Sequence, residues 1–469
     1  MNNNPKPKVW EALVPILILI VTLGCAIILF DASPHIPLVI GAAAAALMAI
    51  KVGFKWSDLE KGIVKTINLS LEAIIILMII GIVIASWIAS GTVPTLIYYG
   101  LKILSPSIFL VATCIICSIV SVCTGSSWTT AGTVGVALMG VGSGLGINPS
   151  MTAGAIISGA YFGDKMSPLS DTTNLAPAVA GSNLFDHIKH MVYTTGPSLI
   201  ISLILFGILG AGFSGKALDV SQIDLITKGL EDNFNLSLLT LIPPIVVLIM
   251  VSKKLPATPV LLLGSLLGCI LGVFLQGIAP GEFFSILNDG FVINSGVPMI
   301  DKLLSRGGLQ SMMSTVALIF CAMSFGGIME YAGFLNILAE KILKLAVNTG
   351  SLVLITVVSC ITLNFLTGDH YLSILIGGRM YKDEFEKRNL APKNLSRILE
   401  DAGTITSPFV PWSTCGAFMS KTLGVANFAF LPFCFLNLIN PIISIIYGFT
   451  GITMAKIDED KPIGKNLSM

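Results

Sequence analysis

Two polar segments interrupt the apolar sequence, and each contains a Ser-Pro pair. They are Ser167-Pro168, within residues 163–174, and Ser407-Pro408, within residues 401–414, so that 240 residues (407 − 167) separate the two serines. Non-helical backbone inside a bilayer is tolerated only where it is buried in protein or lines a polar cavity. Proline-interrupted, hydroxyl-rich segments at matching places in two halves of a chain are typical of a substrate or ion site.

The composition places the chain in a membrane. Of 469 residues, 54% are hydrophobic and only 11% are charged, and the mean hydropathy is +0.88. A soluble domain is about 25% charged, so a soluble chain of this length would have too little charge to cover its surface. The net charge of +1 argues neither for nor against nucleic acid as a partner, but no basic tract is present, so nucleic-acid binding has little support.

The apolar runs are long enough to cross a bilayer about ten times, because about 20 apolar residues form one span. Candidate spans are residues 10–30, 36–50, 69–90, 150–182, 191–213, 235–252, 256–277, 309–332, 395–424 and 425–449, of which 150–182 and 395–424 are broken. Two more stretches, 107–143 and 350–378, are each interrupted near the middle. Each could be a span followed by a loop, or a re-entrant hairpin that enters and leaves on one face.

Loop charges favour the hairpin interpretation, because cytoplasmic loops are enriched in Lys and Arg. The polar segments 51–66, 253–254 and 379–397 are basic, whereas 214–233 and 278–300 are acidic. With the N-terminus inside, every basic loop falls inside and every acidic loop outside, provided that both interrupted stretches are hairpins. We therefore predict an all-α polytopic membrane protein with about ten transmembrane helices, two re-entrant hairpins and both termini in the cytoplasm.

The same counting divides the chain into two repeats of opposite orientation. We expect N-terminal helices in residues 1–59, a first inverted repeat in 60–213, linking helices in 214–304, a second inverted repeat in 305–450 and a cytoplasmic tail in 451–469. Each repeat would run helix, surface segment, hairpin, broken helix, helix. The first apolar run is not followed by a small-residue cleavage site, so we interpret it as a retained helix rather than a signal peptide.

The hairpin tips and helix breaks are rich in oxygen-bearing side chains. Half-helix N-termini favour anions, and unwound carbonyl groups coordinate cations, so two tips and two breaks that meet at mid-membrane would form a compact polar site. Sodium prefers hard oxygen ligands. The candidates are Ser126, Ser127 and Thr129 from the first tip, Ser170, Asp171, Thr172, Thr173 and Asn174 from the first break, Asp369 and His370 from the second tip, and Thr406, Ser413 and Thr414 from the second break.

Ionisable residues inside spans are costly, so each is a functional hypothesis by default. Asp171 is the first choice, with Thr173 and Asn174, for a Na⁺ site; the alternative is that Asp171 caps the second half-helix. Asp164 could face the cavity or cap a helix end. His370 could contact a proton or a carboxylate, or be a structural histidine. Before the second break Asp401 is a better candidate than its neighbour Glu400.

The first break carries a family resemblance. Residues 163–174, Gly-Asp-Lys-Met-Ser-Pro-Leu-Ser-Asp-Thr-Thr-Asn, closely resemble the signature of the NhaC family of Na⁺/H⁺ antiporters, and the tip Thr-Gly-Ser-Ser-Trp-Thr at 124–129 is similar to that of the same family. The resemblance covers most of the chain. It implies sodium coupling, inverted repeats and a mobile transport domain. Because some members look like malate/lactate antiporters or amino-acid symporters, it does not fix the solute.

We therefore predict a sodium-coupled secondary transporter of the bacterial inner membrane that exchanges Na⁺ for H⁺ by alternating access, with no cofactor beyond the coupling ion. Its partners would be Na⁺, H⁺ and membrane lipid, and a homodimer is compatible with the sequence. The first alternative is Na⁺-coupled transport or exchange of a small carboxylate (malate or lactate) or an amino acid on the same fold. A passive channel is the second. A membrane enzyme is disfavoured because the sequence has no metal-ligand cluster or nucleophile–base spacing.

Overall fold

The protein is helical throughout the part of the chain that the computed structural model describes, namely residues 6–30, 32–213, 220–253 and 255–457. Within these ranges, eight helices are long and apolar enough to cross a membrane, or ten if each of two bent pairs is one span. The prediction of an all-α polytopic membrane protein is confirmed. Residues 214–219 and 254, which belong to the loops used for the topology, and 458–469 of the predicted tail lie outside the described residues.

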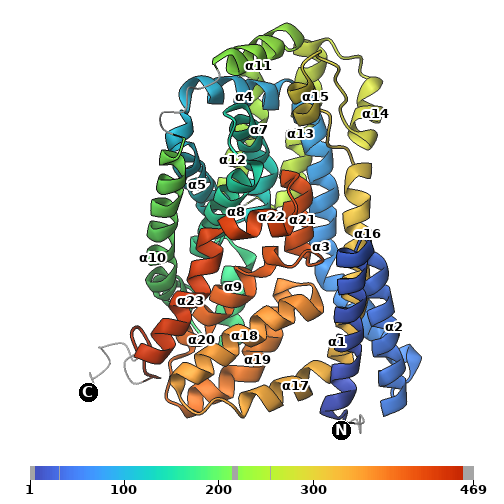
Figure 1. The fold of residues 1–469 in the computed structure, drawn as a ribbon, viewed down its shortest axis with the longest axis vertical. Coiled ribbons are helices and arrows are strands. Elements are labelled where there is room, and N and C mark those ends of the chain that lie inside the picture. The colour runs from blue at the N-terminus through green and yellow to red at the C-terminus, as the bar shows by residue number, and fades with distance from the viewer. Residues whose placement is uncertain (1–5, 31, 214–219, 254, 458–469) are drawn as a thin grey trace, which may run out of the picture.

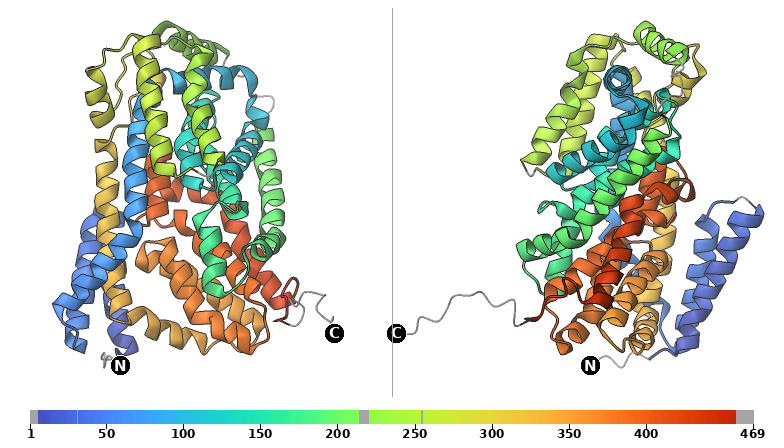
Figure 2. Two further views of the ribbon diagram at one scale, coloured as in Figure 1. Left: turned by 180° about the vertical axis from the view of Figure 1, so that it is seen from behind. Right: turned by 60° about the vertical axis from the view of Figure 1, so that its left-hand side comes forward.

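The first two helices form an antiparallel pair that packs beside α16 (Figures 1 and 2). They are α1 (Val9–Gly24), which continues as a π-helix over Cys25–Leu29, and α2 (His35–Val52). Large apolar side chains on the outer faces of these helices are exposed, among them Leu17, Val21 and Leu47. Exposed apolar surface of this extent suits contact with lipid rather than with water.

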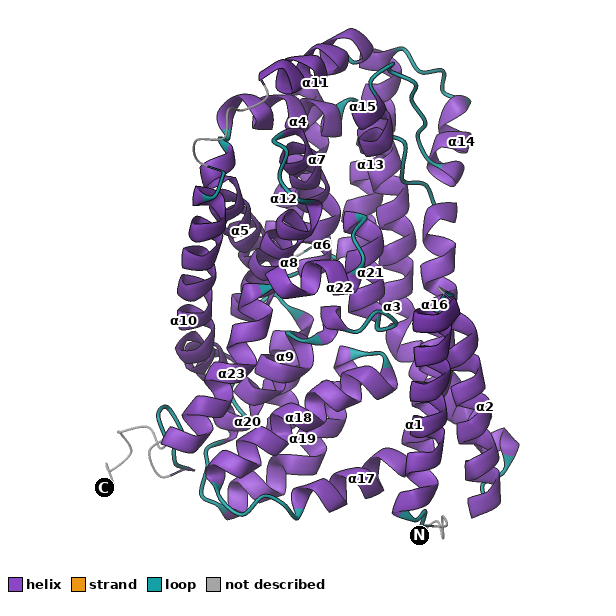
Figure 3. Cartoon of the chain, viewed as in Figure 1, coloured by secondary structure: helices purple, strands orange, loops and turns teal. Residues whose placement is uncertain are grey.

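The first half of the chain follows as a long helix, a short surface helix, a hairpin, a broken helix and another long helix. Its elements are α3 (Trp56–Ala89), α4 (Thr92–Ile103), α5 (Pro106–Thr124), α6 (Ser127–Thr130), a π-helix over Ala131–Gly135, α7 (Val136–Gly144), α8 (Pro149–Met166), α9 (Asp171–Ala180) and α10 (Leu184–Ala211). Figure 3 shows the loop that separates α8 from α9.

Five helices and one 3₁₀ turn link the two halves. They are α11 (Val220–Asn233), the 3₁₀ turn Leu238–Leu241, α12 (Ile242–Ser252), α13 (Ala257–Gln276), α14 (Glu282–Asp289) and α15 (Pro298–Leu304). Of these, α13 packs along α3, and α11, α14 and α15 lie at the upper end in Figure 1.

The second half has the same order of elements as the first. It consists of α16 (Gln310–Tyr331), α17 (Phe334–Leu343), α18 (Thr349–Thr367), α19 (His370–Lys387), α20 (Pro392–Leu399), a π-helix over Glu400–Thr404, 3₁₀ turns over Ser407–Phe409 and Leu431–Phe433, α21 (Thr414–Leu423), α22 (Asn427–Phe430) and α23 (Phe435–Thr450). In Figure 1 the hairpin of α18 and α19 lies in the lower half, whereas α5 and α7 lie in the upper half. The predicted boundaries of the two repeats stay predictions.

Glycine allows both hairpins to turn. Gly125 and Gly368 end α5 and α18 with φ values of 68° and 67°, a left-handed conformation that glycine adopts without steric cost. The next residue caps the returning helix in each case: Ser126 accepts a hydrogen bond from the Thr129 amide, and Asp369 accepts one from the Tyr371 amide. The two tips are thus built by the same local rule.

Proline sets the first break in the broken helices and lies within the second. The residue before proline avoids the helical conformation, and α8 accordingly ends at Met166, just before the Ser167-Pro168 pair, while α9 begins at Asp171. The second break is longer, because the π-helix ends at Thr404 and α21 begins only at Thr414. Each break leaves a helix N-terminus in the interior of the protein.

Candidate functional site

Four helical runs begin around one region in the middle of the molecule. Each N-terminus is capped by an oxygen-bearing side chain that accepts a hydrogen bond from a backbone amide of the first turn: Ser126 at 3.1 Å, Ser170 at 3.4 Å, Asp369 at 2.9 Å and Ser413 at 2.9 Å. A helix N-terminus carries about half a positive charge. Acidic side chains in this region are therefore stabilised by the surrounding backbone.

Asp164, on the last turn of α8, is the acid most enclosed by the cavity. Its side chain is 6% exposed, and the Ser127 hydroxyl of the first tip donates a hydrogen bond of 2.7 Å to Oδ2. The other oxygen, Oδ1, has no hydrogen-bond partner. A buried carboxylate oxygen without a donor is costly, so this atom is poised to bind a proton or a cation.

Asp171 is the first residue of α9 and lies at the mouth of the same cavity, where it is exposed. Its Oδ1 accepts a hydrogen bond of 2.9 Å from the Thr172 amide, and the Tyr371 hydroxyl donates to its Oδ2. Tyr371 belongs to α19, so this bond joins the first broken helix to the second hairpin tip. The N-cap of α9 is Ser170 rather than Asp171, although Asp171 accepts a hydrogen bond from an amide of the first turn. The role of Asp171 in binding Na⁺ stays a prediction.

The cavity between the tips and the breaks has a volume of about 330 Å³. Among the described residues that line it are three acids and one histidine but no Lys or Arg, so it favours cations. The lining comprises Leu69, Glu72, Ala73, Ile76, Ser126, Ser127, Trp128, Tyr161, Asp164, Asp171, Leu175, His370, Tyr371, Leu375, Thr404 and Cys415. Glu72 enters from α3, and Trp128 stacks on Phe418 with ring centroids 4.2 Å apart.

The second tip contributes His370 rather than Asp369 to the cavity. Asp369 is fully buried and accepts hydrogen bonds from two backbone amides and from the hydroxyls of Ser70 (3.2 Å) and Thr414 (3.3 Å). These four donors satisfy the carboxylate. His370 lies 3.3 Å from the Cys415 sulfur through Nδ1, and its ring packs on Tyr371 with centroids 4.1 Å apart.

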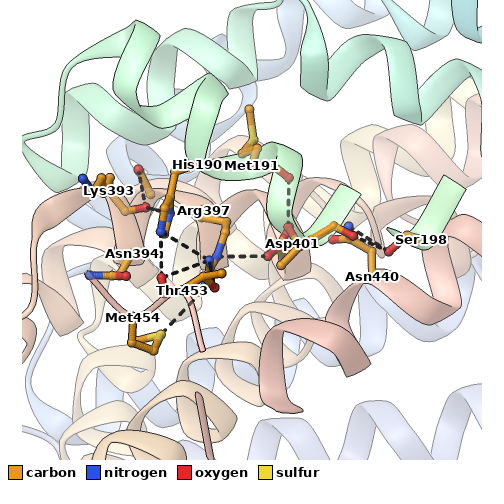
Figure 4. Close-up of polar contacts among 12 residues, drawn as sticks. His190, Met191, Ser198, Lys393, Asn394, Arg397, Asp401, Asn440, Thr453 and Met454 are labelled. Atoms are coloured by element: carbon orange, nitrogen blue, oxygen red, sulfur yellow. Dashed lines mark hydrogen bonds and ion pairs between the residues drawn. The ribbon is translucent and has the colours of Figure 1, made fainter. Parts of the chain in front are cut away.

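Asp401 lies outside the cavity lining, in a buried cluster of charges. The Lys165 ammonium donates to its Oδ1, as does the Thr194 hydroxyl at 3.0 Å, and Arg397 Nε lies 3.8 Å from its Oδ2. Lys165 and Asp401 are both 0% exposed. Figure 4 shows Arg397 between Asp401 and Thr453. Because Lys165 is on α8 and Asp401 follows α20, the pair joins the two broken helices.

Several predicted ligands instead hold the backbone of the breaks. Thr173 Oγ1 donates to the carbonyls of Asp164 and Lys165, at 3.0 and 3.1 Å, and Asn174 Nδ2 donates to that of Ser170 at 2.6 Å. Two further hydroxyls do the same: Thr406 donates to the Ala402 carbonyl and Ser413 donates to the Ser407 carbonyl. The Thr172 hydroxyl pairs instead with that of Ser170, and the backbone carbonyl of Thr129 accepts a hydrogen bond from the Thr133 hydroxyl. Of the predicted Na⁺ ligands Asp171, Thr173 and Asn174, only Asp171 lines the cavity.

Two aromatic hydroxyls and a thiol of the cavity were missed by the sequence reasoning. They are Tyr161, Tyr371 and Cys415. Tyr371 directly follows Asp369-His370 at the second tip, so its position in the chain could have indicated it. Tyr161 lies one turn before Asp164 on α8, on the same helix face, and offered a similar signal. Cys415 directly follows Ser413-Thr414 of the second break, so its position offered the same kind of signal, although a buried cysteine is usually a small packing residue.

The fold and this cavity define a multi-pass membrane protein with a buried carboxylate site between broken helices. Residues 159–452 match the Na⁺/H⁺ antiporter family. A relative named Na(+)/H(+) antiporter NhaC, from Alkalihalophilus pseudofirmus, is 45% identical over 90% of this chain and 91% of its own length. The chain therefore belongs to the Na⁺/H⁺ antiporter family, which confirms the resemblance drawn from the sequence motifs.

Other relatives in this range carry different names. A malate-2H(+)/Na(+)-lactate antiporter from Bacillus subtilis is 40% identical over 87% of both chains, and an arginine/ornithine antiporter, ArcD, from Halobacterium salinarum is 38% identical over 97% of this chain and 95% of its own. Relatives that are 38–45% identical to this chain therefore carry the names of different solutes, so sequence identity at this level does not identify the solute.

Proposed function

We propose that this protein is a Na⁺/H⁺ antiporter of the bacterial inner membrane, with both termini in the cytoplasm. The observation that carries the proposal is the acidic cavity, in which Asp164 Oδ1 is buried without a donor and no Lys or Arg is among the described lining residues. A carboxylate in this position holds either a proton or Na⁺. Exchange follows if the site crosses the membrane only when one of the two is bound.

The four segments around the cavity are joined strongly enough to move as one body. The contacts that cross between the halves include the Tyr371–Asp171 hydrogen bond, the Lys165–Asp401 ion pair and the stacking of Trp128 on Phe418. Alternating access would then carry hairpins and broken helices together past the outer helices. In this mechanism Asp164 binds the ion, Ser127 orients one carboxylate oxygen, and Asp171 receives the ion at the cavity mouth.

The direction of the pH dependence follows from competition for one carboxylate. Protons bound at low pH exclude Na⁺, so the apparent affinity for Na⁺ falls as the pH falls. Each net charge that crosses a potential of 100 mV changes the free energy by about 2.3 kcal/mol. The number of protons exchanged for each Na⁺ therefore decides whether the membrane potential drives the exchange.

A second candidate function is Na⁺-coupled exchange of a small carboxylate. Two observations favour it: the volume of about 330 Å³ exceeds what a bare ion needs, and four helix N-termini surround the site, where a substrate carboxylate would be stabilised. The three acids of the lining and the lack of a described Lys or Arg partner weigh against it. The first candidate is the better supported.

The test uses purified protein in liposomes that contain a pH-sensitive dye. An inward Na⁺ gradient should alkalinise the lumen, because protons leave as Na⁺ enters, and labelled malate, lactate and arginine should not accumulate. Accumulation of a labelled solute without a change of pH would reject Na⁺/H⁺ antiport in favour of the second candidate. Accumulation of Na⁺ against its own gradient, driven by a pH gradient, would exclude a passive channel.

A further inference from the structure

A second cavity, larger than the acidic one, is lined by basic residues. This basic cavity has a volume of about 1300 Å³, and its described lining includes Lys302 on α15, Arg306 between α15 and α16, and Lys421 on α21. Asp289, at the end of α14, is the single acid among these described lining residues. Three positive charges and one negative charge give a net charge of +2 (3 − 1), so the basic cavity favours anions.

The connections that border the basic cavity lie on one side of the membrane under the predicted topology. The lining includes residues 146–148 between α7 and α8, 305–307 between α15 and α16, and 424–426 between α21 and α22. The predicted topology places all three connections outside. Because basic residues are enriched in cytoplasmic loops, three of them around one external cavity do not serve as topology signals and call for another role.

Arg306 lies on a tightly packed backbone segment. Its carbonyl accepts a hydrogen bond of 3.3 Å from the Phe291 amide. Gly307 follows with a φ of 91°, and a Cβ atom on it would lie 2.6 Å from the Ala85 nitrogen of α3, so a larger side chain would not fit. A group that the fold already holds in place costs less to order when a ligand binds.

The side chain of Arg306 extends from this segment to α21. It is half-buried, and its Nη2 donates to the Thr422 carbonyl, next to Lys421. A guanidinium has five N–H donors, and this is the one side-chain hydrogen bond that Arg306 forms with the described residues. Nor do the described ion pairs join any of the three cations to a carboxylate. The basic cavity therefore offers several donors to a ligand.

The N-terminus of a long helix adds to the same preference. Asn148 and Pro149, the N-cap and first residue of α8, both line the basic cavity. Helix N-termini favour anions, and phosphate above all, because their first backbone amides have no partner within the helix. The helix and the three cations thus act in the same direction.

We propose that the basic cavity binds a phosphate group between Arg306, Lys302 and Lys421. Arg and Lys are the side chains that recognise phosphate, and a phosphate monoester carries a charge of about −1.5 to −2 near pH 7, which matches the net charge of the lining. A free phosphate ester and an anionic lipid headgroup both supply this group. Because Lys421 belongs to α21 whereas Arg306 precedes α16, the bound group joins the second broken helix to the start of α16.

The competing explanation is that Arg306 only caps the C-terminus of α21, as basic side chains often do, and that Lys302 and Lys421 are ordinary exposed charges. A cap accounts for the bond to the Thr422 carbonyl but not for the position of all three cations around one cavity. A cap would also affect stability alone, without a phosphate ligand.

The experiment measures phosphate binding to purified full-length protein in two ways. Inorganic phosphate, as the potassium salt at constant ionic strength, is titrated calorimetrically into protein in detergent, and lipid retained from nanodiscs of phosphatidylglycerol and phosphatidylcholine is identified by native mass spectrometry. Arg306→Gln should weaken phosphate binding or phosphatidylglycerol retention at least about tenfold, since it removes charge-assisted hydrogen bonds. Arg379→Gln is the matched control, because Arg379 is an exposed arginine on α19 outside this lining; it should bind like the wild type.

Binding in either measurement that Arg306→Gln weakens supports the site, and the measurement that shows it identifies the source of the phosphate. No binding of inorganic phosphate together with no preference for phosphatidylglycerol would overturn the proposal, as would wild-type binding by Arg306→Gln. If that variant does not fold, Lys421→Gln decides, since Lys421 is exposed: weaker binding supports the proposal and unchanged binding overturns it. The measurement uses no Na⁺ gradient, so a wild type that binds phosphate without Na⁺-driven pH change in liposomes would reject only the antiporter.

Discussion

Both halves of this protein place acids at a hairpin tip or near a helix break but use them differently. In the first half, Asp164 and Asp171 face the cavity, and Asp164 keeps one oxygen without a donor. In the second half, Asp369 is satisfied by four donors as a helix cap, and Asp401 is paired with Lys165. Under the proposed function, Asp164 and Asp171 present charge to the ion, whereas the charges of Asp369 and Asp401 are satisfied within the protein.

The largest effect is expected for Asp164→Asn. The loss of a buried charge that pairs with a bound cation costs about 3–5 kcal/mol, and at 1.4 kcal/mol for each factor of ten Na⁺ affinity should fall at least about 100-fold. Na⁺-driven pH change in liposomes measures this. The protein should remain folded, because the variant removes a charge that has no ionic partner.

Asp401→Asn should instead lower stability. It leaves the Lys165 ammonium buried without its carboxylate, which costs about 3–5 kcal/mol, and a thermal melt in detergent would show it. Replacing both partners by apolar residues, as in Lys165→Met with Asp401→Leu, should recover part of the loss. If Asp401→Asn melted like the wild type and lost only Na⁺ binding, the assignment of Asp401 to fold stability rather than to ion binding would be wrong.

Asp171→Asn tests the residue that the sequence ranked first. The sequence predicts loss of sodium-dependent transport; the structure predicts a smaller change than for Asp164, because Asp171 is exposed and solvent screens its charge. Titration of transport rate against Na⁺ concentration should show a higher half-saturating concentration with transport retained at saturation. Complete loss at all Na⁺ concentrations would move the central role back to Asp171.

Tyr371→Phe should have the smallest effect of the four. It removes one hydrogen bond to an exposed carboxylate, whose charge solvent screens, and a hydrogen bond of about 1 kcal/mol corresponds to about fivefold in affinity. The same Na⁺ titration measures it, and the double variant with Asp171→Asn should add little. A larger effect than that of Asp171→Asn would mean that the phenol has a role beyond that bond.

The fold could be predicted in large part because its determinants are local. Apolar runs of fixed length mark spans, Ser-Pro pairs mark the breaks, and the glycines at 125 and 368 allow the tips to turn. The capping roles of Ser126 and Ser170 follow from the same local chemistry. Which of these oxygen atoms cap a helix and which line the cavity does not follow from local chemistry. A hydroxyl in a break can face the backbone or the ion with little change in sequence.

The partners of the buried charges could not be predicted, because they join residues far apart in the chain. Lys165 and Asp401 are 236 residues apart, and Asp171 and Tyr371 are 200 apart. Periodicity fixes which side of a helix a residue occupies but not what packs against that side. Asp401 was preferred to Glu400 on sequence grounds, whereas the structure pairs Asp401 and leaves Glu400 without a donor. Neighbours on a helix point in different directions, so only the folded structure distinguishes the two acids.

The most direct test is the Na⁺ affinity of the wild type and of Asp164→Asn in liposomes, measured over a series of pH values. If Na⁺ and protons compete for buried carboxylates, the wild-type affinity should weaken about tenfold or more for each unit of pH on the acidic side, and Asp164→Asn should lose most of both the affinity and this slope. A wild-type affinity that does not change with pH, or an Asp164→Asn variant that retains the wild-type slope, would contradict the account.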